Sequence, residues 1–71
     1  MSEASFSFTV YMIHAMADYW DTTPCKAYKL LSESGCITNY LVKHYDVLHT
    51  QGTQYLAQDV NEYLVQRGYA L

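Results

Sequence analysis

The residue types best suited to chemistry are few in this chain and widely spaced. The sequence has three histidines and two cysteines, which are His14, His44, His49, Cys25 and Cys36. His44 and His49 are five residues apart, so a helix does not bring them to one face as the spacing of four in a helical metal site would. No pattern places a cysteine beside a histidine, as a thiol nucleophile requires. We therefore predict no metal site, no cofactor and no catalytic residue.

His14 and Asp18 form a second arrangement with chemical potential. They are four residues apart within one apolar segment, which is the spacing of an imidazole oriented by a carboxylate for acid-base work. No nucleophile is near them in the sequence, and a chain of 71 residues has little room for a pocket of a few hundred Å³. We interpret the pair as an exposed side-chain contact on a helix and expect the protein not to be an enzyme.

The amino-terminal segment has neither the length of a membrane span nor the pattern of a secretory signal. Its apolar stretch has about 15 residues, against the roughly 20 that a bilayer requires, and it contains His14 and Asp18. Glu3 stands where a secretory signal carries basic residues. We expect a cytoplasmic protein with no membrane segment. Cys25 and Cys36 are therefore interpreted as free thiols that act as small buried hydrophobic residues, although one disulfide between them is conceivable.

The spacing of apolar residues predicts an all-α fold, a small bundle of four helices that forms a single domain over residues 1–71. The predicted helices cover about residues 5–20, 24–34, 38–48 and 53–66. Three hydroxyl residues are predicted N-caps, and these are Ser5, Thr23 (followed by Pro24 at the first helical position) and Thr53. Three glycines mark predicted helix ends: Gly35, Gly52 and Gly68. The short Gly35-Cys36 connection allows the two middle helices to cross at a steep angle.

Each of the last three predicted helices has one apolar face. The predicted inward residues are Ala27, Tyr28, Leu30 and Leu31 in the second helix, Ile37, Leu41, Tyr45 and Leu48 in the third, and Leu56, Val60, Tyr63 and Leu64 in the fourth. We expect the tail of residues 69–71 to fold back on the bundle through Tyr69 and Leu71.

The first predicted helix has more apolar surface than one face can bury. Two stripes run along it, Phe6-Val10-Ile13-Ala17-Trp20 and Phe8-Met12-Ala15-Tyr19, and they leave only Ser7, His14 and Asp18 as a polar seam. A helix that is apolar nearly all round is enclosed by neighbours, which come from the same chain or from a second copy. The residues expected at such a partner interface are Phe8, Met12, Tyr19 and Tyr11.

Tyrosine is unusually frequent, with eight among 71 residues. So many hydroxyls are difficult to pair inside one small core, whereas tyrosine is favoured at protein interfaces. The tyrosines are therefore either ordinary residues at the core boundary or part of a contact surface. Together with the first helix, they favour a protein-binding module that is a homo-oligomer or binds another small protein.

The alternative function is a helix-turn-helix DNA-binding regulator, because residues 24–48 have about the right helix lengths. The net charge is −3, and the four lysines and arginines are scattered rather than clustered. The third predicted helix offers Asn39 and Lys43 to base edges, with Asp46 beside them. This composition argues against nucleic acid as a partner.

The chain resembles a known family over nearly its full length. The segment YDVLHTQGTQY at residues 45–55, followed by LAQDV at 56–60 and EYL at 62–64, is similar to short bacterial proteins known only as a domain of unknown function, number thirty-seven ninety-one. AYKLL at 27–31 and Gly35 match as well, and Leu48 to Gly52 is the most specific part. Pro24-Cys25 and the Ala70-Leu71 ending are less typical.

The resemblance implies no activity and no catalytic residue. Members of the family accompany other small bacterial genes, some of which resemble ADP-ribosyltransferase-type toxins, and this implies a regulatory or antitoxin-like role toward a neighbouring gene product. We interpret His49, Thr50, Gly52 and Thr53 as a structural joint. In this joint the imidazole and the hydroxyl bond carbonyls at the end of the third helix, while glycine turns the chain.

Overall fold

The protein is helical throughout the part that the structure describes. The computed structural model describes residues 2–69, which contain helices α1 (Glu3–Tyr19), α2 (Pro24–Glu33), η1 (Ile37–Val42), α3 (Tyr45–Leu48) and α4 (Thr53–Gln66), and no strand. The predicted all-α class is confirmed. No helix within residues 2–69 combines the length and the apolar character that crossing a bilayer requires.

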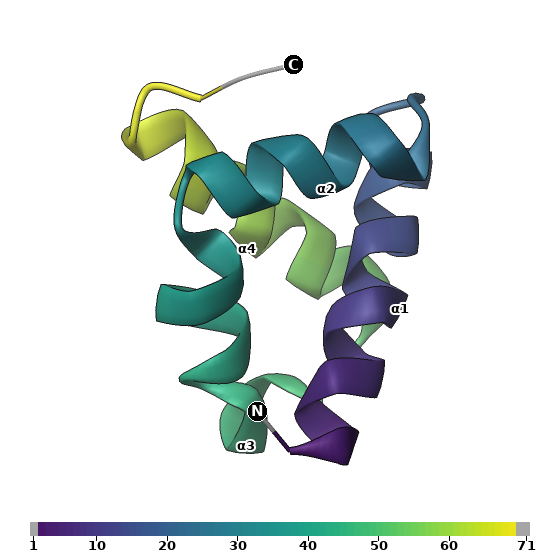
Figure 1. The fold of residues 1–71 in the computed structure, drawn as a ribbon, viewed down its shortest axis with the longest axis vertical. Helices are drawn as coiled ribbons and strands as arrows, with labels where there is room; N and C mark the ends of the chain where they lie inside the picture. The colour runs from purple at the N-terminus through teal and green to yellow at the C-terminus, as the bar shows by residue number, and fades with distance from the viewer. Residues whose placement is uncertain (1, 70–71) are drawn as a thin grey trace.

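The helices form a small globule of 27 × 21 × 20 Å rather than a parallel bundle (Figure 1). In Figure 1, α1 rises on one side, α2 crosses at a steep angle above it, and the η1–α3 segment descends on the other side. α1 contacts α2, η1 and α4. The steep crossing allowed by the short connection after α2 is therefore observed, and α1 also packs against Tyr45 of α3 through Phe8.

The start of α1 differs from the prediction, whereas the start of α2 agrees with it. Ser2, not Ser5, is the N-cap of α1, and Ser2 Oγ accepts a 3.1 Å hydrogen bond from the backbone N–H of Ser5. Ser5 itself lies buried in the first turn. At α2, Thr23 Oγ1 accepts from the N–H of Lys26 at 3.3 Å, so this predicted N-cap is confirmed.

The three glycines have two different backbone conformations. Gly35 has φ +78° and Gly68 has φ +83°, so both occupy the left-handed region that releases a helix end, as predicted. Gly52 does not. Its extended backbone, φ −69° and ψ 150°, makes it the N-cap of α4, so Thr53 lies inside the helix and is not the cap. Asp21, with φ 53°, takes the left-handed position after α1.

The third predicted helix, residues 38–48, is wrong as a single element. Residues Ile37–Val42 form a π-helix, and the chain then breaks at His44, whose φ of −109° and ψ of 23° leave the helical region before the short α3 begins. The two halves face different partners, because Tyr40 contacts α4 through Asp59 whereas Tyr45 contacts Phe8 on α1. A π-helix has a wider turn than an α-helix, but six residues are too few for the difference to show in the spacing of apolar residues, so the sequence pattern did not reveal the change.

The core collects small and medium side chains from every helix. Its buried hydrophobic residues are Met12, Met16, Ala17, Ala27, Leu31, Cys36, Leu41, Leu48, Leu56, Ala57, Val60 and Leu64. Most inward residues predicted for the last three helices are buried or half-buried, but Tyr28 is 52% exposed. Cys36 is buried as expected, whereas Cys25 is exposed, and both thiols are free.

The buried face of α1 is not either predicted stripe. Ser5 and Thr9 are buried together with Met12 and Met16, and Thr9 Oγ1 donates a 2.8 Å hydrogen bond to the Ser5 carbonyl. Because that hydroxyl is satisfied within the helix, a small polar side chain can lie where helices approach closely. Phe6, which headed the first predicted stripe, is 58% exposed instead.

The carboxyl end returns to the helices, as predicted for Tyr69. The Tyr69 ring packs against the core, and its hydroxyl donates a 3.3 Å hydrogen bond to the carbonyl of Glu33 at the end of α2. The second predicted anchor, Leu71, lies outside the described residues.

Candidate protein interface

The exposed side of α1 lies between two hollows, one on each flank. On one flank α1 meets α2 and η1, and on the other it meets α3 and the segment that leads into α4. We call the first hollow the apolar groove and the second the aromatic groove. Because α1 contributes to both, the helix is a ridge between two recessed surfaces.

The apolar groove has a volume of about 400 Å³. It is lined by Phe6, Thr9, Val10, Ile13, Tyr28, Ser32, Ile37 and Thr38. Among these lining residues there is no charged side chain, and the polar ones are all hydroxyls. A surface of this composition suits an apolar and uncharged occupant, because a buried charge without a partner in the groove would be costly.

Large side chains at the apolar groove remain exposed to water. Phe6 is 58% exposed, Tyr28 is 52% exposed and Val10 is 39% exposed. Ile13 and Ile37 are half-buried and pack against the core below them. Phe6 and Val10 on α1 and Tyr28 on α2 therefore border a hollow whose floor belongs to the folded interior.

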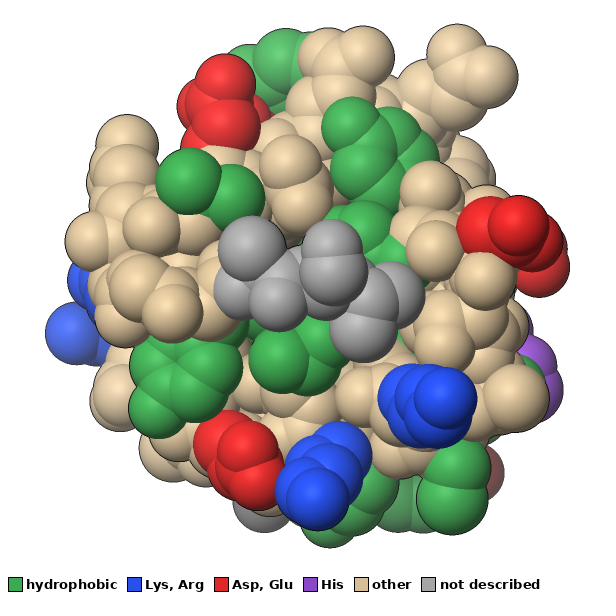
Figure 2. Space-filling model, turned by 90° about the horizontal axis from the view of Figure 1, so that it is seen from above, with side chains coloured by type: hydrophobic (Ala, Val, Ile, Leu, Met, Phe, Trp, Pro, Cys, Tyr) green, Lys and Arg blue, Asp and Glu red, His purple; other side chains and the backbone are tan. Residues whose placement is uncertain are grey.

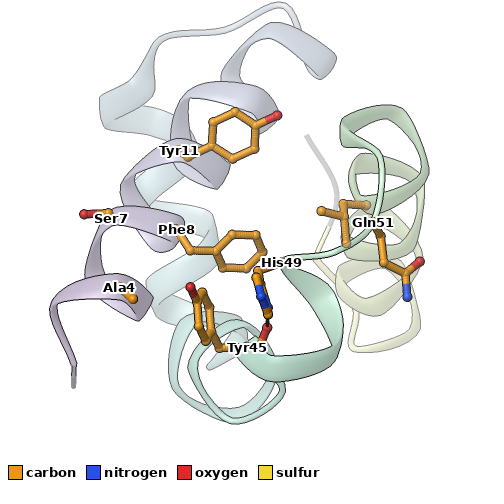
Figure 3. A pocket seen from close by; sticks show the side chains of 8 residues that line it. Ala4, Ser7, Phe8, Tyr11, Tyr45, His49 and Gln51 are labelled. Carbon is orange, nitrogen blue, oxygen red and sulfur yellow. Dashed lines mark hydrogen bonds between the residues drawn. The ribbon is translucent and has the colours of Figure 1, made fainter.

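The aromatic groove is the larger hollow, about 490 Å³, and Figure 3 shows how its side chains lie. The Phe8 ring meets the Tyr45 ring edge to face, with centroids 5.5 Å apart. Tyr45 also stacks on His49, with centroids 4.5 Å apart and an interplanar angle of 16°. Ala4, Ser7, Tyr11, Gln51 and Leu56 complete the lining.

The predicted joint residues lie beside this groove. His49 Nδ1 donates a 2.8 Å hydrogen bond to the Tyr45 carbonyl, and Thr50 Oγ1 donates a 2.9 Å bond to the Val47 carbonyl. Both bonds satisfy backbone acceptors at the end of α3. Thr53 Oγ1 is hydrogen-bonded to the hydroxyl of Tyr11 on α1. The joint is thus connected to α1 as well as to its own helix ends.

The four residues expected at a partner interface have different surroundings. Tyr11 is 47% exposed at the aromatic groove, and Phe8 is half-buried there. Tyr19 is 46% exposed near the other end of α1, beside a third hollow of about 250 Å³. Met12 has no exposed surface and lies in the core of its own chain, which corrects the expectation for that residue. Phe6, Val10 and Tyr28 were not singled out as interface residues, although Phe6 and Val10 share one apolar stripe.

We predicted no catalytic role for the histidines, the cysteines or Asp18. His14 and Asp18 are both exposed on α1. Within residues 2–69 no cluster of three or more histidine, cysteine, aspartate or glutamate side chains has the arrangement of a metal site. Burial raises the pKa of the Cys36 thiol to about 12. Burial also raises the pKa of Tyr40 to about 12, helped by the nearby Asp59 carboxylate, which accepts its hydrogen bond at 3.3 Å.

A helix-turn-helix reader would place residues 37–48 in a DNA groove as one continuous helix. In the structure that segment is a six-residue π-helix and a four-residue α-helix separated by a break.

Figure 2, seen from the end of the molecule above α2, shows hydrophobic side chains as separate patches among polar atoms. The apolar groove and the aromatic groove lie on the two flanks of α1.

Comparison with known families gives one match. The sequence model of the family described as "Protein of unknown function (DUF3791)" matches residues 7–67. The chain belongs to the DUF3791 family. The DUF3791 match covers most of α1, all of α2 and α4, and the joint at residues 49–53. No curated protein and no solved structure matches the chain.

Proposed function

We propose that the protein is a protein–protein interaction module that binds its partner along the exposed side of α1. The observation that carries the proposal is the uncharged apolar groove, bordered by Phe6 and Tyr28 that are each more than half exposed. Exposed apolar surface around a hollow is typical of interaction sites, and aromatic side chains supply much of the energy of protein interfaces. An aromatic or aliphatic side chain of the partner would fill the hollow.

The proposed role is regulatory rather than catalytic. Two polar groups at the aromatic groove are already engaged within the protein, since His49 Nδ1 bonds the Tyr45 carbonyl and the Tyr11 hydroxyl bonds Thr53. The family resemblance supports an antitoxin-like partner role toward a neighbouring gene product in the bacterial cytoplasm, because family members accompany other small genes, some of which resemble ADP-ribosyltransferase-type toxins. A second copy of the chain is the other partner that we propose.

Affinity purification from the native host tests the proposal. We expect a tagged wild-type chain to retain a partner that a Phe6→Ser, Tyr28→Ser double variant loses, because both rings at the apolar groove are removed. Val47→Ser is the matched control, since Val47 is 61% exposed on α3 and is not among the residues lining the groove. The control variant should retain the partner, and circular dichroism should show that all three chains are folded.

Two results would contradict the proposal. One is the same set of co-purifying proteins from the wild type, the double variant and the control. The other is retardation of duplex DNA at low salt that weakens steeply as salt rises, which is the behaviour of a DNA-binding regulator.

A further inference from the structure

We propose that a second copy of the chain pairs with the first along α1 in one antiparallel register, with Ser7 opposite Val10 of the second copy and Glu3 opposite its His14. The inference rests on the proposed function and names one partner for the same surface. Its basis is the arrangement of exposed residues on α1 and the two grooves beside them.

The outermost line of α1 has the spacing of a helix-pairing seam. Glu3, Ser7, Val10 and His14 are all exposed and are separated by four, three and four residues, the repeat by which two helices pack along each other. The seam ends after His14, because Ala17, the next position in the repeat, is buried in the core of its own chain. The available seam is therefore the amino-terminal three turns of the helix.

The seam residues complement one another when a two-fold axis relates the copies. An antiparallel pair with Ser7 opposite Val10 places a small side chain against a branched one, and it does so twice. The same register places the Glu3 carboxylate, an acceptor, opposite His14, whose ring N–H is a donor. No other charged side chain lies on the seam between them, so the two copies do not oppose like charges there.

The flanks of the seam complement one another in the same register. A two-fold axis brings like flanks together, so the two apolar grooves face each other and the two aromatic grooves face each other. Phe6 then lies toward Ile13 of the second copy, at the lining of its apolar groove. Tyr11 lies toward Ala4 of the second copy, at the lining of its aromatic groove. Each hollow receives a ring that is about half exposed in the single chain.

The seam is small for a specific protein interface. Residues 3–14 span about 18 Å at about 1.5 Å per residue, and the chain has a total accessible surface of 4479 Å². A standard specific interface takes about 800 Å² from each partner, which is more than three helical turns supply. We therefore expect a reversible dimer with a dissociation constant of order micromolar to tens of micromolar, not a permanent one.

Sedimentation equilibrium over about 1 µM to about 1 mM tests the register with a charge exchange. His14→Glu places two carboxylates opposite each other at both ends of the seam, and it should weaken the dimer about tenfold or more. The double variant Glu3→Lys, His14→Glu restores opposite charges across the seam and should recover most of that loss. Gln58→Glu is the matched control, because it adds the same charge at an exposed site on α4 and should leave the dimer unchanged.

Three outcomes would overturn the inference. They are a wild-type chain that stays monomeric up to about 1 mM, equal dimerisation of the His14→Glu chain and the wild type, and failure of the double exchange to recover the dimer. Thermal unfolding of each variant by circular dichroism separates lost pairing from lost folding. A monomeric wild type that still captures a partner dependent on Phe6 and Tyr28 would end this inference and leave the proposed function standing.

Discussion

At the residue scale, the surroundings of Cys36 and Tyr40 raise the pKa values of both side chains. Cys36 is fully buried between α2 and η1, and its thiol is held in the protonated form by burial, with a pKa of about 12. The Tyr40 ring packs against the Tyr63 ring, with centroids 5.0 Å apart. The Arg67 guanidinium lies over the Tyr63 ring. Both groups are neutral at neutral pH, and neither has the properties of an activated nucleophile.

Alkaline pH should destabilise the protein because of these two groups. The thiol pKa is about 12 in the folded chain against an ordinary 9.0, and the phenol pKa is about 12 against 10.0. Between these values the folded state binds more protons than the unfolded state, so the free energy of unfolding falls as pH rises from about 9 toward 12. Urea denaturation at successive pH values measures the slope.

Substitutions assign that slope to its sources. Cys36→Ala and Tyr40→Phe should each reduce the slope, whereas Cys25→Ala, at an exposed thiol, should not. A slope unchanged in both core variants would show that other groups cause the alkaline loss.

At the scale of elements, helix ends are set by a few local contacts and by left-handed residues. Thr23 with Pro24, Gly35 and Gly68 could be predicted because capping and left-handed glycine depend on neighbouring residues alone. The π-helical η1 could not be predicted, since six residues are too few for its wider turn to show in the apolar spacing. η1 also contacts α4, which is distant in the sequence, through the hydrogen bond from the Tyr40 hydroxyl to Asp59.

Two glycines with different backbones provide a matched test of these helix ends. Gly35→Ala should lower the free energy of unfolding by about 1–2 kcal/mol, because φ +78° is unfavourable for a residue with a Cβ. That Cβ would also lie 2.9 Å from the Asn39 side-chain nitrogen. Gly52→Ala, at φ −69° with no heavy atom within 4 Å of the new Cβ, should change stability by no more than about 0.5 kcal/mol, because the lower entropy of the unfolded chain offsets the poorer N-cap preference of alanine.

Thermal or urea unfolding of the two variants gives the comparison directly. Equal losses for Gly35→Ala and Gly52→Ala would contradict the assigned backbone conformations.

At the scale of the whole molecule, the packing of α1 decides which of its apolar residues face water. The helix buries Ser5, Thr9, Met12 and Met16 and leaves Phe6 exposed. α2 crosses the carboxyl-terminal end of α1 (Figure 1), and α1 also packs against η1 and α4. The rings of Phe6 and Tyr11 lie on the flanks of α1, at the grooves that we propose as an interface.

Truncation to alanine should therefore lower folding stability strongly at Met12 and hardly at all at Phe6. Met12→Ala leaves a cavity in the core and should cost about 2–5 kcal/mol of folding stability, because Met12 is fully buried. Phe6→Ala should change the stability of the monomer by no more than about 0.5 kcal/mol, because most of its ring already faces water.

Urea denaturation at protein concentrations well below the dissociation constant of the proposed dimer measures both changes in the monomer. A large loss for Phe6→Ala under these conditions would place that ring in the core and remove the surface on which both proposals depend.

The sequence by itself determined the helical class, the end of α2, most inward residues of the last three helices and the family of the chain. These features depend on short-range spacing, on capping chemistry and on segments such as Leu48 to Gly52. Only the tertiary structure decided that Met12 is core and Phe6 is surface, that Thr9 is buried, and that the joint at His49 lies beside α1. Those outcomes depend on how closely helices distant in the sequence approach one another, and the apolar pattern of a helix that is hydrophobic on several sides is compatible with more than one such packing.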